Sequence, residues 1–257
     1  MKKILGAMII GLCASSGAYA QDQQVLQVFA CNFNDGKNLD NLAAWIEDFR
    51  EFATSGENQD PGAGSFAWLP FRGAAPYDYI LGFISSSLND MATGVQGYYA
   101  SPQGQALEAQ ANETADCISG IVMSEQLRNG VIGNTGDDQL DAVVELFSCT
   151  LNRGSDLDDV RSASDFLNKQ IDAIGSAALS QYESYMWTPY RGGTGNWDFL
   201  WVGNHSNLST WAQADTDYYG SKEGQAAEER FQKISTCTNS MWGGYWIVPP
   251  AEGPTAE

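Results

Sequence analysis

The stretch VFACNFNDGKNLDNL at residues 28–42 returns in altered form as LFSCTLNRGSDLDDV at residues 146–160, without a gap. Both copies carry Phe, Cys, Asn, Gly, Leu and Asp in the same places. Residues 78–117 match residues 198–237 in the same way. A self-match over about a hundred residues indicates a tandem duplication. Two copies favour a closed body of two related units over a solenoid.

Each copy has a residue pattern that predicts the element order β-α-β-β-α-β. The strands are rich in β-branched and aromatic residues, and the helices repeat apolar residues at helical spacing. Asn38 is placed as the N-cap of the first helix, and Ser101-Pro102 restarts a helix after a break. This order is that of the ferredoxin-like unit, an α+β fold. The first copy is expected to hold strands VLQVFACNF (25–33), SFAWLPFRG (65–73), YDYILGF (77–83) and CISGIVM (117–123), with helices between them.

The repeat also sets the expected domain organisation. The stretch NGVIGNTGDD (129–138) is rich in Gly, Asn and Asp, which indicates a linker, and the C-terminal PPAEGPTAE indicates a loose tail. We therefore expect a first ferredoxin-like repeat at 21–128, a linker at 129–142, a second repeat at 143–248 and a flexible tail at 249–257.

The first twenty residues, MKKILGAMIIGLCASSGAYA, have the features of a secretory signal peptide. Lys2 and Lys3 form a basic start, residues 4–12 form an apolar run, and Ala18-Tyr19-Ala20 forms a cleavage site. The apolar run is too short to span a membrane. We expect cleavage after Ala20 and a mature protein that is periplasmic or secreted.

The mature chain is strongly acidic. Removing residues 1–20 takes two lysines from the 13 basic residues and none from the 32 acidic ones, so the net charge becomes 11 − 32 = −21. Such a surface repels phosphate backbones and anionic lipids, which argues against a nucleic-acid or membrane partner. With 43% hydrophobic and 12% aromatic residues, the chain can still bury a core.

Four cysteines remain after cleavage: Cys31, Cys117, Cys149 and Cys237. In an oxidising compartment an even count predicts disulfides, and four cysteines allow three pairings that spacing alone does not resolve. The repeat favours Cys31–Cys117 and Cys149–Cys237, because these pairings place the same bridge in each copy. The alternative, a metal site, lacks the close C-x-x-C pairs that such sites use, so no metal is expected.

The second helix of each copy is broken, and its restart in the first copy reads YYASPQGQAL at residues 98–107. With this feature the unit resembles the dimeric α/β-barrel superfamily, which includes antibiotic-biosynthesis-type monooxygenases and NIPSNAP-like domains. The likeness covers nearly all of each copy. It implies two repeats packed sheet to sheet as a pseudo-two-fold barrel, here within one monomer. It also implies that the last strand of a copy lies beside the first, in agreement with the Cys31–Cys117 pairing.

A Trp–Pro–aromatic–Arg run occurs in the second strand of both copies. Alternate residues of a strand share a face, so Trp68 and Arg72 are expected on one side, and Trp187 and Arg191 on the same side of the second copy. If this face lines the barrel interior, the four side chains form an aromatic-walled pocket with two guanidinium groups. Such a pocket would bind an anionic or aromatic small molecule.

The same residues also have a structural interpretation. In it the tryptophans belong to the core, and each arginine forms an ion pair with Asp78 or Asp198, which start the next strand. Tyr98 and Tyr218 stand near the break in the second helix and are further ligand-binding candidates. A half-buried tyrosine commonly finds a partner for its hydroxyl within the fold, so their signal is weaker.

His205 is the only histidine of the chain, and its counterpart in the first copy is Ser85. No serine has the G-x-S-x-G surroundings of a hydrolase nucleophile. The resemblance implies a different role, since haem-using members of the superfamily ligate iron through a histidine. His205 would then be the haem ligand. Without haem, no cofactor is expected.

Together these features predict an exported soluble protein that binds a small organic molecule in the barrel interior. The resemblance implies an alternative, a cofactor-independent or haem-dependent enzyme of the oxygenase or isomerase type. A third hypothesis is a structural or interaction protein whose barrel is filled by side chains.

Overall fold

The computed structural model describes residues 23–55, 64–72, 75–130, 140–192 and 195–249, without the side chain of Arg72. The predicted signal peptide, most of the predicted linker and most of the predicted tail lie outside these residues. No helix among the described residues is both long enough and apolar enough to cross a membrane.

Each half of the chain has the predicted order, with the second helix broken in two. The first half contains β1 (Gln24–Phe33), α1 (Leu39–Thr54), β2 (Gly64–Arg72), β3 (Tyr79–Ser85), α2 (Leu88–Ala100), α3 (Pro102–Thr114) and β4 (Ala115–Arg128). The second half contains β5 (Ala142–Leu151), α4 (Leu157–Ile174), a short 3-10 turn (Leu179–Gln181), β6 (Glu183–Gly192), β7 (Phe199–His205), α5 (Leu208–Tyr219), α6 (Lys222–Ile234) and β8 (Ser235–Val248).

Local chemistry explains the break in the second helix. The Oγ atom of Ser101 caps α3 by accepting a hydrogen bond from the Gly104 N–H at 2.9 Å, and Ser221 caps α6 with Gly224 at the same distance. A Cβ atom at either glycine would overlap a tyrosine carbonyl oxygen of the preceding helix. The close approach of the two helices therefore requires glycine at these positions.

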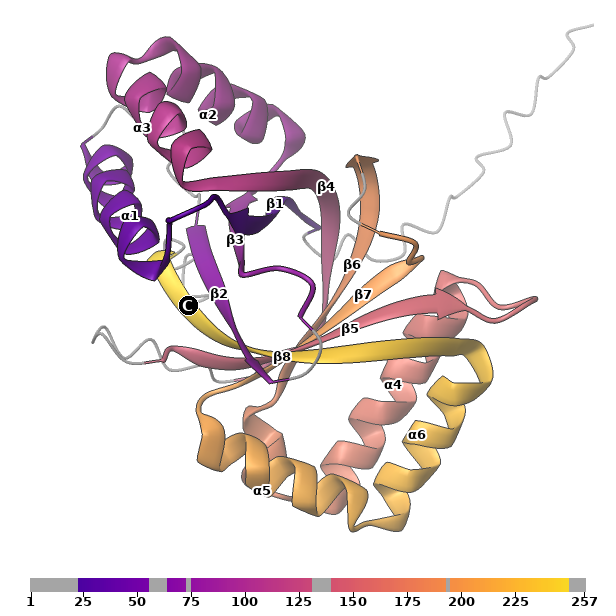
Figure 1. Ribbon diagram of the computed structural model, residues 1–257. Helices are drawn as coiled ribbons and strands as arrows, with labels where there is room; N and C mark the ends of the chain where they lie inside the picture. The colour runs from indigo at the N-terminus through magenta and orange to yellow at the C-terminus, as the bar shows by residue number, and fades with distance from the viewer. Residues whose placement is uncertain (1–22, 56–63, 73–74, 131–139, 193–194, 250–257) are drawn as a thin grey trace, which may run out of the picture.

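The eight strands close into one antiparallel barrel, in the order β1-β3-β2-β8-β5-β7-β6-β4 (Figure 1). Each half contributes a four-stranded sheet, and the two sheets join where β2 pairs with β8 and β4 pairs with β6. The expected barrel is confirmed, but its halves are joined edge to edge by backbone hydrogen bonds rather than only face to face. This closure leaves neither sheet with an unpaired edge.

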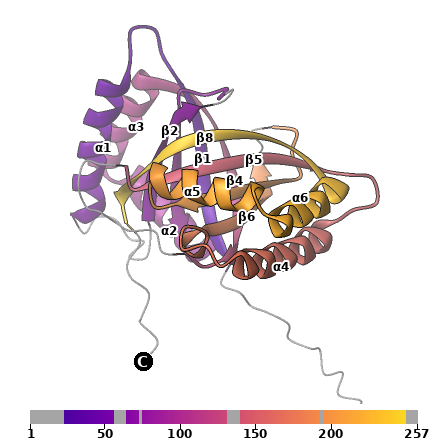
Figure 2. The ribbon, with the colours of Figure 1, turned by 90° about the horizontal axis from the view of Figure 1, so that it is seen from below.

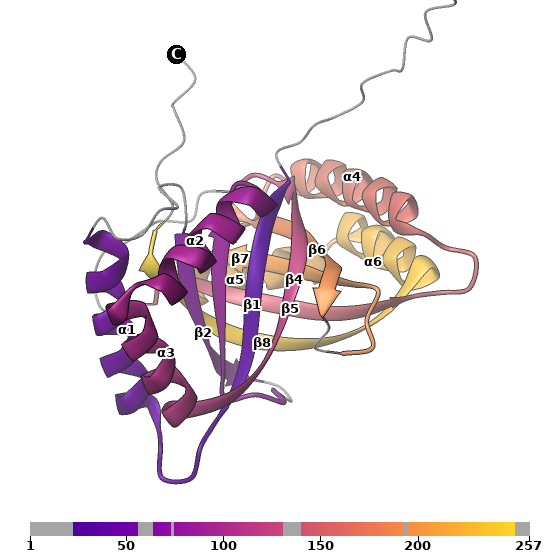
Figure 3. The same cartoon turned by 90° about the horizontal axis from the view of Figure 1, so that it is seen from above.

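The helices of each half cover the outside of its own sheet. Figures 1 and 3 show α1, α2 and α3 on one side of the barrel and α4, α5 and α6 on the opposite side. The view from below shows the same separation of α1 and α3 from α4 and α6 (Figure 2). Buried apolar residues form three clusters, one inside the barrel and one beneath each helical layer.

Both predicted disulfides are present. Cys31 is bonded to Cys117 and Cys149 to Cys237. Each bridge joins two strands that are direct neighbours, since the cysteines stand opposite one another in the β1–β4 and β5–β8 ladders. The bridges close loops with sequence separations of 86 and 88 residues. On the chain-entropy account each contributes on the order of 4 kcal/mol.

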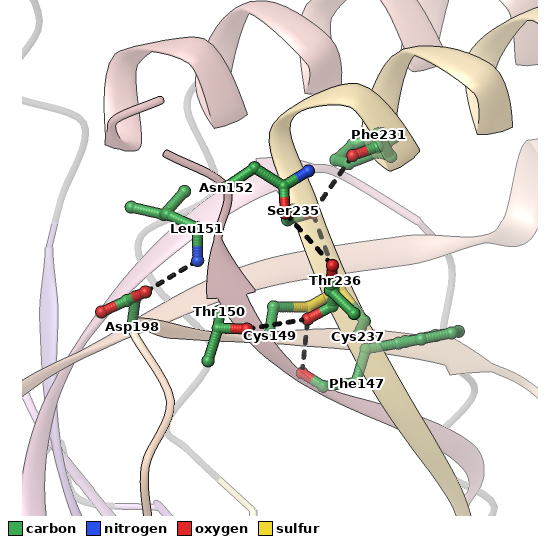
Figure 4. The surroundings of a disulfide bond; sticks show 10 residues. All are labelled: Phe147, Cys149, Thr150, Leu151, Asn152, Asp198, Phe231, Ser235, Thr236 and Cys237. Carbon is green, nitrogen blue, oxygen red and sulfur yellow. Dashed lines mark hydrogen bonds between the residues drawn. A yellow bond between two sulfur atoms is a disulfide. The ribbon is translucent and has the colours of Figure 1, made fainter. Parts of the chain in front are cut away.

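The repeated aspartates hold the strand beside each disulfide. Asp198 Oδ2 accepts a hydrogen bond from the Leu151 N–H at 2.7 Å (Figure 4), and Asp78 Oδ2 accepts one from the Phe33 N–H at 2.9 Å. The backbone N–H of each aspartate in turn donates to the carbonyl oxygen of Cys149 or Cys31. The aspartates are therefore retained to fasten the start of one strand to the end of its neighbour.

Candidate functional site

The two predicted tryptophans lie inside the barrel and stack on each other. Trp68 is 5% exposed and Trp187 is 4% exposed, and their rings are 5.2 Å apart with 11° between the planes. Phe66 stacks on Trp68 at 4.8 Å. A cavity of about 90 Å³ remains beside the stack. The tryptophans are therefore part of the packing that fills the interior.

The regular alternation of side chains is interrupted between Trp187 and Arg191. The ladder between β4 and β6 pairs Val122 with Pro189 and Ile121 with Arg191, so Tyr190 is an extra residue. Such a bulge shifts the alternation of side chains by one. The Arg191 side chain is exposed, and its guanidinium carbon lies 5.7 Å from the centre of the Tyr190 ring.

The first half has the same irregularity. There β8 pairs Trp242 with Pro70 and Met241 with Arg72, which leaves Phe71 as the extra residue. In the second half, Trp187 and Arg191 line different cavities, because strict alternation does not continue through the bulge. The side chain of Arg72 lies outside the described part of the structure. Among the described residues, no ion pair joins Arg191 to Asp198.

The predicted tyrosines lie on the other side of the sheets. Tyr98 and Tyr218 each line a cavity between the helices and the outer face of the sheet in their own half. Burial raises the pKa of both phenols, with further contributions from Glu108 and Glu228 respectively. The six predicted ligand-binding residues therefore do not form one pocket.

His205 stands at the end of β7 on this outer face. It is 3% exposed, and its Nε2 atom lies 3.3 Å from Glu145 Oε2 on the neighbouring strand β5. In the ladder His205 is opposite Val143, two residues before Glu145 on the same face. Its Nδ1 atom is buried and has no hydrogen-bond partner among the described residues. With the proton on Nε2 facing the carboxylate, Nδ1 is the atom that can accept a proton.

The aromatic side chains of Tyr182 and Trp201 lie beside the histidine on this face. The Tyr182 ring lies 5.1 Å from the His205 ring, and its hydroxyl accepts a hydrogen bond from Trp201 Nε1 at 2.8 Å. Gly203 makes room for this ring, since a Cβ atom there would lie 2.9 Å from the Tyr182 ring and hydroxyl. Burial is the main cause that raises the pKa of Tyr182. The tyrosine therefore stays an uncharged phenol beside the imidazole.

A cavity of about 150 Å³ separates this face of the sheet from α4, α5 and α6. Trp211 also lines this cavity, and its buried Nε1 atom has no hydrogen-bond partner among the described residues. Buried polar atoms are normally hydrogen-bonded, so two residues with unpaired nitrogens in the lining of one cavity make it a candidate site for a polar ligand. Tyr219, at the edge of the cavity, is 51% exposed, which places the cavity near the surface. Besides His205 the wall contains Glu145, Asp215, Glu228, Tyr182, Tyr218, Tyr219, Trp201, Trp211, Phe147, Phe199, Phe231 and the Cys149–Cys237 disulfide.

The carboxylates of the cavity act on Asp215 and on the phenols. Burial, followed by the charge of Glu145, raises the pKa of Asp215, while His205 opposes this shift. Burial raises the pKa of Tyr219 to about 12, with added effects of Glu228, Glu145 and Asp215. Negative charge therefore converges on the cavity from three elements, β5, α5 and α6.

The first half has an equivalent cavity of about 180 Å³ but different chemistry. It keeps the tyrosine pair and Glu108, which correspond to Tyr218, Tyr219 and Glu228. Gln27, Ser85 and Val95 line it where the second half has Glu145, His205 and Asp215. The second-half cavity therefore contains two carboxylates and an imidazole, from Glu145, Asp215 and His205, that the first-half cavity lacks.

Sequence reasoning identified His205 but not its surroundings. Glu145 and Asp215 look like ordinary acidic residues in a chain with 32 of them. The comparison between the two copies could have identified them, because both acidic residues stand where the first copy has an uncharged residue, one before His205 in the sequence and one after it. This difference between the copies indicates a site only when β5, β7 and α5 are known to meet at one cavity.

A haem does not fit at His205. Its Nε2 atom already faces Glu145, and the cavity of about 150 Å³ lies below the range of about 300–1,000 Å³ found for drug-sized ligands. A volume of this size suits a molecule as small as benzene. In the described residues, no group of three His, Cys, Asp or Glu side chains is placed to hold a metal ion.

Comparisons with solved structures place the chain in a fold. A monooxygenase-like protein from Fusobacterium nucleatum has a TM-score of 0.58 and 11% identity, over 91% of this chain and 96% of its own. A monooxygenase-like protein from Lactobacillus acidophilus has a TM-score of 0.57 and 8% identity, over 90% and 97%.

A chlorite-dismutase-like protein has a TM-score of 0.52 and 13% identity, over 87% of this chain and 95% of its own. No family model matches the sequence, and neither does any curated protein. The chain therefore has the dimeric α/β-barrel fold, while identities this low carry no activity.

Proposed function

We propose that the protein is an exported enzyme that moves a proton on a small organic substrate held in the second-half cavity. His205 acts as the general base through Nδ1, and Glu145 holds the imidazole by its Nε2 side. The observation that carries the proposal is the unpaired Nδ1 atom of a histidine that is only 3% exposed and lines a cavity. A base positioned in this way typically contributes about 10²–10⁴-fold to a reaction rate.

The substrate is a molecule of about one aromatic ring. The volume of about 150 Å³ supports this size, and the aromatic walls support a flat apolar body. The proposal needs no cofactor, which agrees with an oxygenase or isomerase type of reaction that proceeds through proton abstraction. That reaction type is also compatible with the monooxygenase-like names of the structural neighbours.

The second-half cavity is preferred to the barrel interior as the ligand site. The interior cavity is smaller, about 90 Å³, and stands beside a tightly stacked tryptophan pair. The helix–sheet cavity is larger and is lined by His205, whose Nδ1 atom is unpaired, whereas the unpaired atom of a residue lining the interior cavity is the amide oxygen of Asn204, which is not a base. The alternative is an interaction protein with a filled barrel, which does not need a buried base. On that alternative, replacing His205 would not change the rate of a base-catalysed reaction.

Export is part of the proposal. It is supported by the signal-like residues 1–20 and by two disulfides, which persist in oxidising compartments. Mass spectrometry of the protein from a periplasmic extract or culture medium is expected to show a chain that begins at Gln21. An intact chain that retains Met1 and fractionates with the cytosol would contradict export.

The decisive experiment uses 1,2-benzisoxazole, a probe of general bases in which a five-membered ring is fused to one benzene ring. His205 Nδ1 takes the proton from C3, the C–H electron pair forms the nitrile, and the N–O bond breaks to release the phenolate oxygen, which solvent protonates. We expect His205→Ser to lower the rate by about 10²-fold. Serine already occupies the equivalent position 85, so this change is compatible with the fold.

Ser85→Ala is the matched control in the other half and is expected to keep the full rate. Glu145→Gln, which installs the residue found at position 27, is expected to give an intermediate rate. Circular dichroism would establish that each variant is folded. Equal rates for the wild type and His205→Ser would refute the role of His205 as a base.

A second readout is independent of any substrate. His205 is the only histidine of the chain, so ¹⁵N-histidine labelling of untagged protein gives the spectrum of one imidazole. The neutral ring is expected to carry its proton on Nε2, facing Glu145. A neutral ring with the proton on Nδ1 would remove the acceptor that the proposal requires.

A further inference from the structure

The walls of the second-half cavity have an unusual balance of charge. Glu145, Asp215 and Glu228 contribute three carboxylates, and none of the described residues that line the cavity is a lysine or an arginine. Arg128 is near enough for its charge to act on Tyr182, but it forms an ion pair with Asp172 at 2.9 Å. Among the described residues of the wall, His205 beside Glu145 is therefore the only basic side chain that the carboxylates can pair with.

The roles of the three carboxylates differ. Glu228 interacts with the phenols of Tyr218 and Tyr219, as Glu108 does with its tyrosine pair in the first half. Glu228 is therefore accounted for by the packing common to both halves. Glu145 and Asp215 are additional, and the charge of Glu145 helps to raise the pKa of Asp215 across the cavity.

Aromatic rings complete the lining. Trp201 and Trp211 stand with three phenols and three phenyl rings around the same volume. The faces of such rings attract a cation, most strongly for tryptophan. Carboxylates and aromatic faces favour the same kind of ligand group. Both disfavour an anion.

We infer that the second-half cavity selects a protonated amine carried on a small apolar body, with Asp215 and Glu145 facing the ammonium group. This inference rests on the proposed function and names the substrate class of the same site. It reverses the charge expected from the sequence, where two arginines indicated an anionic ligand. The net charge of −21 on the mature chain adds long-range attraction for cations.

Calorimetric binding measurements with three molecules of similar shape and different charge test the inference: benzylammonium, benzyl alcohol and benzoate. Each contains one ring and one small polar group, in keeping with the volume of about 150 Å³. We expect benzylammonium to bind about tenfold more tightly than benzyl alcohol, with benzoate the weakest of the three. Perturbation of the single ¹⁵N-histidine spectrum would locate the bound probe at His205.

The variants separate the site from the overall acidity of the protein. Asp215→Val, which installs the residue of the first half, is expected to remove most of the preference for the amine over the alcohol. Glu108→Gln, the matched carboxylate change in the first half, is expected to retain it. Equal effects of the two changes would mean that general surface charge attracts the amine, and would overturn the inference.

Failure of this inference is distinguishable from failure of the proposed function. Tighter binding of benzyl alcohol or benzoate, together with turnover of benzisoxazole that depends on His205, would leave the base in place and overturn the amine selectivity. Absence of binding by all three probes would overturn the selectivity as well. Loss of His205-dependent turnover would then decide separately against the proposed function.

Discussion

Replacing the stacked tryptophans in the barrel interior distinguishes packing from ligand binding. Trp68 and Trp187 are 5% and 4% exposed, and their rings are 5.2 Å apart and nearly parallel. Truncating a buried aromatic residue to alanine costs about 3–5 kcal/mol. Phenylalanine retains most of the ring, so we expect Trp68→Phe and Trp187→Phe each to lower the free energy of unfolding by about 1–2 kcal/mol.

The contact itself is measured by the double variant. An aromatic pair contributes about 0.5–1.5 kcal/mol beyond its buried area, so the two changes together are expected to cost less than their sum by about that amount. Urea unfolding followed by far-ultraviolet circular dichroism gives the four free energies. The matched control is Trp45→Phe, at a buried position of α1 in a different cluster. The losses of unfolding free energy caused by Trp45→Phe and Trp187→Phe should add within about 0.5 kcal/mol.

Two results would refute this reasoning. Strict additivity of Trp68→Phe and Trp187→Phe would mean that the rings do not interact in the folded protein. Nearly unchanged stability in both single variants would mean that the tryptophans are held open for a ligand, as the sequence pattern first indicated. The expected losses correspond to a lower melting temperature by about 2–4 °C per kcal/mol for a chain of this size.

Two further predictions concern the acidic residues. Asp198→Ala removes the acceptor of the Leu151 N–H and is expected to lower the free energy of unfolding in urea by about 1.5–3 kcal/mol. The control is Asp35→Ala at an exposed position, which should change this free energy by less than about 0.5 kcal/mol. Similar values for both variants would contradict the role given to the repeated aspartate. Burial raises the pKa of Glu183 above 4.5 in spite of hydrogen bonds from Tyr185, Asn204 and Gln126. A raised carboxyl pKa means that the folded state binds the proton more tightly, so this contribution to stability is fully present below the unfolded pKa and is lost as the pH rises through the folded pKa. The stability of the wild type relative to Glu183→Gln should therefore fall between pH 4.5 and neutral pH, and a rise over that interval would contradict the sign.

Sequence periodicity was sufficient for the architecture of each half. The β-α-β-β-α-β order of each half was predicted from the self-match at residues 28–42 and 146–160, the strand patterns and the Ser-Pro restart. The repeat selected the disulfide pairing. These features are local or are copied between the two halves, so a single sequence contains them. The edge-to-edge closure of β2 with β8 and β4 with β6 depends on contacts between halves, and no local pattern encodes those.

The site shows the opposite balance. Trp68 and Arg72 look like neighbours on one face because a strand is assumed to alternate, and the extra residue at Phe71 appears only in the pairing with β8. Glu145, His205 and Asp215 are far apart in sequence and meet because two strands and a helix converge on one cavity.

The sequence by itself determined the repeat, the elements and the bridges, because these follow from residue spacing. Only the tertiary structure decided which side chains face one another, because a single bulged residue or a strand crossing changes that arrangement without changing the pattern.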